Sequence, residues 1–68
     1  MCGIIGINSN KPVSATIINS LKKLEYRGYD SAGIATLSNG LINEIKSEGR
    51  VENLEKNSLT QNLEGTIG

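Results

Sequence analysis

The strongest constraint on this chain is its length combined with the residues it lacks. It has 68 residues, one cysteine, and no histidine, tryptophan or phenylalanine. A single cysteine cannot form an internal disulfide, and a chain without histidine cannot build an ordinary zinc cluster. Below roughly 70–80 residues, one hydrophobic core rarely supplies more than about 3–5 kcal/mol without such a staple. The sequence therefore predicts one small domain, or a piece of one, with marginal stability as an isolated monomer.

Composition excludes several classes of function. Seven basic and seven acidic residues cancel, and no aromatic stacking platform accompanies the scattered basic residues, so we expect no nucleic-acid partner. No apolar run approaches the ~18 residues of a membrane span, and the N-terminus lacks the pattern of a secretory signal. One free cysteine without an export signal favours the reducing cytoplasm. The sequence also predicts no metal and no cofactor.

The N-terminal half predicts a strand followed by a helix. Cys2–Ile7 is a short apolar run, which predicts a buried strand. Asn10 is expected to cap the following helix, with Pro12 in its first turn, and Gly28 is expected to end it. Apolar residues recur there at the spacing of an amphipathic helix: Val13, Ile17, Ile18, Leu21 and Leu24.

The C-terminal half predicts a hairpin and a short helix. Ala32–Leu37 and Leu41–Lys46 read as two strands joined by an Asn-Gly turn, which tolerates the positive φ of tight hairpins. Val51–Asn57 predicts a weak helix with Val51, Leu54 and Leu59 on its apolar side. Thr60–Gly68 is polar and turn-rich. The fold class is α+β, a sheet with the longer helix on one face, and Cys2–Ile7 is expected to pair with one arm of the hairpin. Nothing in the sequence is expected to cover the other face.

Cys2 is the candidate nucleophile. Methionine before a small residue is usually trimmed, which would leave Cys2 with a free amine. Such a residue carries both an attacking thiol and an α-amino group, whose ordinary pKa of about 7.7–8.0 suits a general base. No histidine is available for a Cys–His pair. The ordinary alternative is that Cys2 only packs as a small hydrophobe, as most cysteines do.

Two motifs resemble a known family: MCGIIGI at the start of the chain and LEYRGYDSAGIA at residues 24–35. Together they resemble the N-terminal glutaminase domain of the class II glutamine amidotransferases, which are N-terminal-nucleophile hydrolases. Within that family, the form from Tyr26 to Gly33 is similar to the glucosamine–fructose-6-phosphate aminotransferase branch. The resemblance implies an N-terminal fragment of an αββα sandwich, with L-glutamine as the substrate.

The resemblance also implies roles for two residues. The Cys2 thiol would attack the side-chain amide carbon of glutamine, release ammonia for transfer to fructose 6-phosphate, and leave a glutamyl thioester that water hydrolyses. Arg27 matches a family arginine close to the nucleophile, and its fixed charge would favour the thiolate or order the N-terminus. The alternative for Arg27 is an ordinary charged turn clamped by a salt bridge to Asp30.

Residues 1–68 correspond to only part of the family's glutaminase domain. The family pattern continues into a segment resembling HTRWATHG, which helps hold the substrate, then an Asn-Gly pair that forms the oxyanion hole, and then the sugar isomerase domains. We therefore expect the 68-residue chain to be inactive alone. Three hypotheses stay open: an enzyme part completed by a complementary chain, a non-catalytic remnant of a decayed gene, or an interaction module that binds a glutaminase chain.

Overall fold

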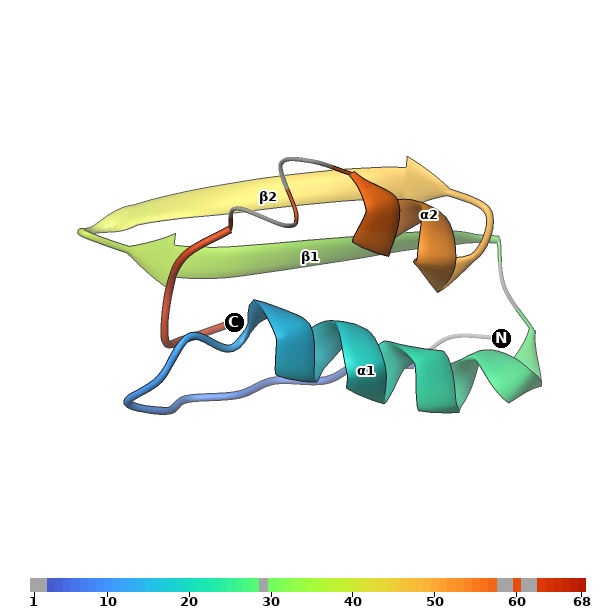
Figure 1. The fold of residues 1–68 in the computed structure, drawn as a ribbon, viewed down its shortest axis with the longest axis horizontal. Helices are drawn as coiled ribbons and strands as arrows, with labels where there is room; N and C mark the ends of the chain where they lie inside the picture. The colour runs from blue at the N-terminus through green and yellow to red at the C-terminus, as the bar shows by residue number, and fades with distance from the viewer. Residues whose placement is uncertain (1–2, 29, 58–59, 61–62) are drawn as a thin grey trace.

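The computed structural model describes residues 3–28, 30–57, 60 and 63–68, and it confirms the α+β class. Its elements are α1 (Ser14–Leu24), the 3-10 turn η1 (Glu25–Arg27), β1 (Ser31–Ser38), β2 (Leu41–Glu48) and α2 (Val51–Lys56) (Figure 1). β1 and β2 form an antiparallel two-stranded sheet. No helix in the described part of the chain is long and apolar enough to cross a membrane.

The hairpin and the second helix follow the predictions. Asn39 and Gly40 have φ values of 53° and 79°, the positive values that a tight two-residue hairpin turn requires. β1 and β2 begin and end within two residues of the expected strands. α2 ends at Lys56, and both Val51 and Leu54 are buried as predicted. The predicted contribution of Leu59 lies outside the described residues.

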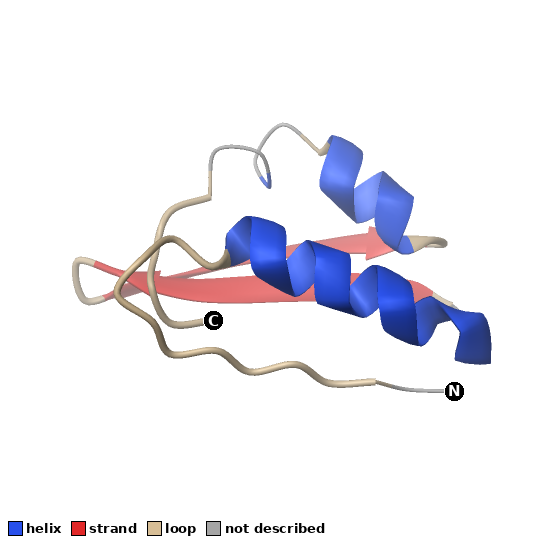
Figure 2. Ribbon diagram, turned by 60° about the horizontal axis from the view of Figure 1, so that its bottom comes forward, coloured by secondary structure: helices blue, strands red, loops and turns tan. Residues whose placement is uncertain are grey.

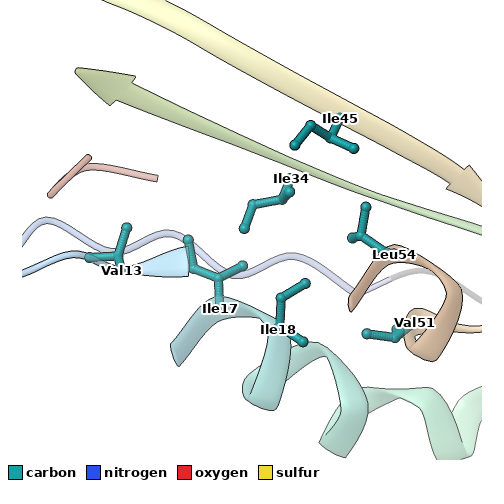
Figure 3. Packing of buried hydrophobic residues seen from close by; sticks show 7 residues of the cluster. All are labelled: Val13, Ile17, Ile18, Ile34, Ile45, Val51 and Leu54. Atoms are coloured by element: carbon teal, nitrogen blue, oxygen red, sulfur yellow. The ribbon is translucent and has the colours of Figure 1, made fainter. Parts of the chain in front are cut away.

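One hydrophobic core joins the helices to a single face of the sheet. Ile34 of β1 is paired with Ile45 of β2, and both side chains point toward the helices (Figure 3). The expected stripe of α1 meets them there, since Val13, Ile17 and Ile18 are buried and Leu21 is partly buried. Among the described residues, the buried apolar set is Val13, Ile17, Ile18, Ile34, Ile45, Val51 and Leu54.

The predicted start of the first helix is wrong. α1 begins at Ser14 rather than after Asn10, and Val13 in the cap position provides no side-chain cap. A long-range contact explains the difference, because the Val13 N–H donates to the Gly65 carbonyl over 3.0 Å and the Ser14 hydroxyl donates to the Leu63 carbonyl over 3.3 Å. The C-terminal segment thus provides hydrogen-bond partners at the start of α1, where Asn10 was expected to provide the cap. Gly28 does follow the helical segment, after the extra turn η1.

The expected pairing of the N-terminal segment with the hairpin is also wrong. Residues 3–7 form no regular strand, and Ile4 is 90% exposed rather than buried. Ile7 instead exchanges two hydrogen bonds with Gly68, at 2.7 and 2.8 Å. Ile67 forms bridges to Asn8 on one side and to Leu37 of β1 on the other. The C-terminal segment, expected to be only a polar turn, therefore lies between the start of the chain and β1 (Figure 2).

The face of this layer opposite the helices is exposed, as the sequence predicts. Leu37 is paired with Ile42 across the hairpin and with Ile67 on its other side, so these three side chains share that face. Ile42 is 73% exposed. Ile4 alternates with the partly buried Ile5 and lies on the exposed side as well. We call this set the outer apolar face: Ile4, Leu37, Ile42 and Ile67.

We predict that the 68-residue chain alone is not a cooperatively folded monomer. Its core holds seven buried apolar side chains in the part of the chain that the structure describes, while the outer apolar face is exposed to water and favours association. Thermal unfolding and hydrogen exchange, measured at several protein concentrations, test this. A sharp two-state transition of the monomer, with well-protected amides in residues 2–7 and 32–46, would contradict the prediction.

Candidate functional site

The predicted nucleophile, Cys2, lies outside the described residues, as does the side chain of Arg27. The backbone of Arg27 belongs to η1. The site-supporting role predicted for Arg27 and its alternative, a salt bridge to Asp30, are therefore both untested. The site can be built from the described neighbours of both residues: Gly3, which follows Cys2 in the chain, and the turn that starts at Gly28.

Gly3 lies against the C-terminal end of α1. A Cβ atom placed on Gly3 would lie 2.7 Å from Cδ1 of Leu24 and 3.2 Å from its Cβ. Both distances are shorter than ordinary carbon–carbon contacts. The first glycine of the MCGIIGI motif therefore permits a close approach of the N-terminal backbone to the helix that leads into the second motif.

A cavity of about 280 Å³ joins the two motifs. Gly3 lines it from the N-terminal segment, and Gly28, Asp30 and Ser31 line it from the turn between η1 and β1. Its remaining lining comes from the end of α1, the start of β1 and the first residue of α2: Leu21, Leu24, Glu25, Ala32, Gly33 and Val51. Residues more than 20 positions apart in the sequence thus surround one space.

Backbone contacts hold both ends of this turn. The Gly28 N–H donates to the Glu25 carbonyl over 2.9 Å, and the Gly49 N–H donates to the Asp30 carbonyl over 2.9 Å. Gly28 has a φ of 112°, a value that favours glycine. The turn is therefore fixed to η1 at one end and to the segment after β2 at the other.

Glu25 lines this cavity and makes a long-range structural contact that sequence reasoning missed. Its Oε2 accepts the Val51 N–H over 2.8 Å, and its Oε1 lies 3.4 Å from the guanidinium of Arg50. Only 10% of the Glu25 side chain is exposed. A carboxylate at the first N–H of a helix satisfies a group that has no partner within the helix, so Glu25 caps α2 from a distance of 26 residues. No local sequence pattern signals such a contact.

A metal centre finds no support in the described residues, which contain no group of three or more candidate metal ligands. Among the described residues, resolved pKa changes are confined to one exposed pair on α2. The hydrogen bond between Lys56 and Glu52 lowers the pKa of the Glu52 carboxyl and raises the pKa of the Lys56 amine. These shifts belong to a surface pair on one turn of α2 and say nothing about the site.

Comparison with known proteins finds similarity to glutamine–fructose-6-phosphate aminotransferases. The whole chain is 54% identical over 68 residues to the glutamine–fructose-6-phosphate aminotransferase (isomerizing) of Brucella abortus. It is 52% identical to the corresponding enzyme of Rhizobium meliloti and 50% identical to that of Bradyrhizobium diazoefficiens. In each case the match includes all of this chain.

The chain spans 11% of the length of each of these relatives. Identity of this extent makes the chain homologous to a short stretch of those enzymes. No family model matches the chain, and no solved structure matches it. The similarity thus relates all 68 residues to a short stretch of these enzymes, and it leaves the activity to be proposed.

We predict that Gly3→Ala displaces the N-terminal segment from α1. The added methyl would meet Leu24 at 2.7 Å, and overpacking of this kind costs about 1–3 kcal/mol. The measurement is the NMR chemical shift of the Leu24 methyl groups together with amide exchange at residues 4–8. Gly6→Ala is the matched control, because its added Cβ would have only the Gly68 oxygen nearby, at 4.0 Å. Equal effects of the two variants would show that Gly3 does not make a special contact.

Proposed function

We propose that this chain is the nucleophile-bearing part of a glutaminase domain of the glucosamine 6-phosphate synthase type. The observation that carries the proposal is the identity of 54%, over all 68 residues of this chain, to a glutamine–fructose-6-phosphate aminotransferase. The cavity that joins Gly3 to the turn from Gly28 to Ser31 supports it. Residues 1–68 would form part of a domain of the αββα type, in which another layer would cover the outer apolar face.

The proposed chemistry begins at Cys2. Once Met1 is removed, the freed amine accepts the proton of the thiol, and the sulfur attacks the amide carbon of the glutamine side chain. The same amine returns a proton to the departing nitrogen, so ammonia leaves and a glutamyl thioester remains. Water then hydrolyses the thioester to give glutamate and the free thiol. Ammonia is the product that the second half of the synthase reaction would add to fructose 6-phosphate.

Arg27 has a supporting role in this proposal. It sits in η1, one residue before the Gly28 edge of the cavity. A fixed positive charge there favours a thiolate over a thiol. The close contacts of the neighbouring turn, with Glu25 on one side and Gly49 on the other, would keep the backbone at Arg27 in place.

Residues 1–68 alone would not supply the oxyanion hole that the resemblance implies. Residues 1–68 contain one Asn-Gly pair, Asn39-Gly40, and it forms the hairpin turn between β1 and β2. It is therefore committed to a structural role and does not serve as an oxyanion hole. Loss of one oxyanion donor typically raises the barrier by about 2.7–4 kcal/mol, so a polypeptide without these donors and the substrate-binding segments has no appreciable turnover.

We predict that Met1 is absent from the cellular protein and that Cys2 carries a free amine. The small side chain at position 2 favours removal, and the proposed mechanism needs the amine as its base. Intact-mass analysis, with reagents specific for N-terminal cysteine, measures both features. A retained Met1 would remove the proposed nucleophile–base pair and contradict the mechanism.

We also predict that a polypeptide of these 68 residues releases no ammonia from glutamine, even at high glutamine concentration. Mixed with a polypeptide containing the rest of a relative's glutaminase domain, it should gain activity that depends on Cys2. The measurement is ammonia release, with Cys2→Ala as the inactive control and Arg27→Lys retaining more activity than Arg27→Ala.

Two outcomes would contradict this proposal. Turnover by the 68 residues alone would show that the site is already complete. A stable complex with the complementary polypeptide but without Cys2-dependent turnover would favour the interaction module instead.

A further inference from the structure

The carboxylate of Glu25 ties the turn that contains Arg27 to the start of α2. Its Oε2 accepts the Val51 N–H over 2.8 Å. The Glu25 carbonyl accepts the Gly28 N–H over 2.9 Å, so the same residue also closes the turn around Arg27. We call residues 25–28 the arginine turn. Of these two hydrogen bonds, only the one to Val51 uses a side chain, and a substitution can therefore remove it selectively.

The partner of Glu25 is itself anchored in the core. Val51 is 6% exposed, and Leu54, about one turn later in α2, is fully buried. A helix of six residues is too short to be stable without such packing. The Val51 N–H is the first of α2 and has no acceptor within the helix. The contact with Glu25 therefore links the arginine turn to a fixed point of the core.

Burial separates Glu25 from other acidic residues that form ion pairs. Its side chain is 10% exposed, whereas the side chains of Glu52 and Glu55 are 56% and 42% exposed. Its second oxygen, Oε1, lies 3.4 Å from the guanidinium of Arg50. A carboxylate withdrawn from water needs hydrogen-bond donors from the protein. We therefore expect the bond from Val51 to Glu25 to persist as long as α2 is folded.

The arginine turn borders the cavity that Gly3 lines. Glu25 and Gly28 line this cavity from the turn, and Gly3, the residue after Cys2, lines it from the N-terminal segment. Arg27 lies between Glu25 and Gly28 in the chain, and its backbone belongs to η1. The place of this backbone beside the cavity therefore depends on the contact that Glu25 makes with α2.

We propose that Glu25 is a positioning residue, whose carboxylate holds the arginine turn against α2 and so keeps the positive charge of Arg27 beside Cys2. This inference rests on the proposed function and deepens it, because it names the contact that would give Arg27 its place. The ordinary alternative is that Glu25 only caps α2, in which case its loss would not change the chemistry of Cys2.

The charge of Glu25 and its reach have opposite effects on Cys2, so the two can be separated. A carboxylate near a thiol disfavours the thiolate and makes Cys2 less reactive. A carboxylate that holds Arg27 in place makes Cys2 more reactive, because a fixed positive charge favours the thiolate. Glu25→Gln removes the charge and keeps an oxygen that can accept the Val51 N–H. Glu25→Asp keeps the charge but withdraws both oxygens by one C–C bond, about 1.5 Å.

The test measures how fast iodoacetamide alkylates Cys2 at pH 7, followed by intact mass. The 68-residue chain without Met1 is mixed with the polypeptide of the ammonia-release test, whose cysteines are replaced by serine, so Cys2 is the only thiol present. A lost neighbouring charge lowers the thiolate fraction about tenfold, and the greater reactivity of a more basic thiolate offsets part of this. We expect Glu25→Asp to react about threefold more slowly, and Glu25→Gln to react at least as fast as the unsubstituted chain.

Hydrogen exchange by NMR in the same mixture tests the contact itself. Glu25→Asp should make the amides of Val51 and Gly28 exchange about tenfold faster, because a hydrogen bond to a charged group is lost. The Ile34 amide in the hairpin should stay protected, which shows that the core remains folded.

The matched control is Glu55→Asp. It shortens a carboxylate of α2 that pairs with Lys22 of α1 over 2.6 Å. Glu55 lies outside the described lining of the cavity, so this variant should leave the alkylation of Cys2 unchanged.

An Arg27→Ala background decides whether Glu25 acts through Arg27. Arg27→Ala alone should slow the alkylation of Cys2, and adding Glu25→Asp should then have no further effect. Equal slowing by Glu25→Asp in both backgrounds, or an unchanged rate in Glu25→Asp alone, would overturn the proposal. So would an unprotected Val51 amide in the unsubstituted chain, or loss of protection at Ile34 in Glu25→Asp.

Failure of this inference is distinguishable from failure of the proposed function. Cys2-dependent ammonia release, with an alkylation rate that Glu25→Asp does not change, would overturn only the role of Glu25. The expected alkylation rates without any ammonia release would support the role of Glu25 and contradict the proposed function.

Discussion

The pairing of residues 66–68 with both the start of the chain and β1 is the interaction on which the rest of the structure depends. Ile67 bridges to Asn8 and Leu37, and Gly68 exchanges two hydrogen bonds with Ile7. Without this segment, the N-terminal residues would have no described backbone partner in the layer. The pairing also places Gly68 under Ile17 and Gly65 beside Val13, so it fixes where α1 begins and how closely it lies on the sheet.

The sequence-based predictions are accurate where the interacting residues are close together in the sequence, and they are wrong where these residues are far apart in it. The hairpin depends on the turn at Asn39-Gly40, and the core face of α1 depends on apolar spacing within one helix, so local rules predicted both. The helix start at Asn10 was wrong because the Val13 N–H is bonded to Gly65, 52 residues away. Contacts of that separation leave no periodic trace in the sequence.

The candidate site also combines features that local motifs predict with features that only the structure provides. The sequence predicts the residue types, with Cys2 as nucleophile and Arg27 beside it, because their motifs resemble a family. Their side-chain positions lie outside the described residues. The structure adds what a motif cannot provide: a cavity that Gly3 shares with Gly28 and Ser31. It also adds Glu25, whose carboxylate caps α2 and so connects the turn before Gly28 to a helix that the resemblance does not mention.

The exposed side of the layer links the stability of residues 1–68 to whatever covers the outer apolar face. Ile4 and Ile42 are 90% and 73% exposed on the outer apolar face. Burying one such side chain contributes about 1.5–3 kcal/mol, so covering these two would add about as much as the whole core of a domain this small, ~3–5 kcal/mol. The stability of residues 1–68 therefore depends as much on what covers Ile4 and Ile42 as on the core between the helices and the sheet.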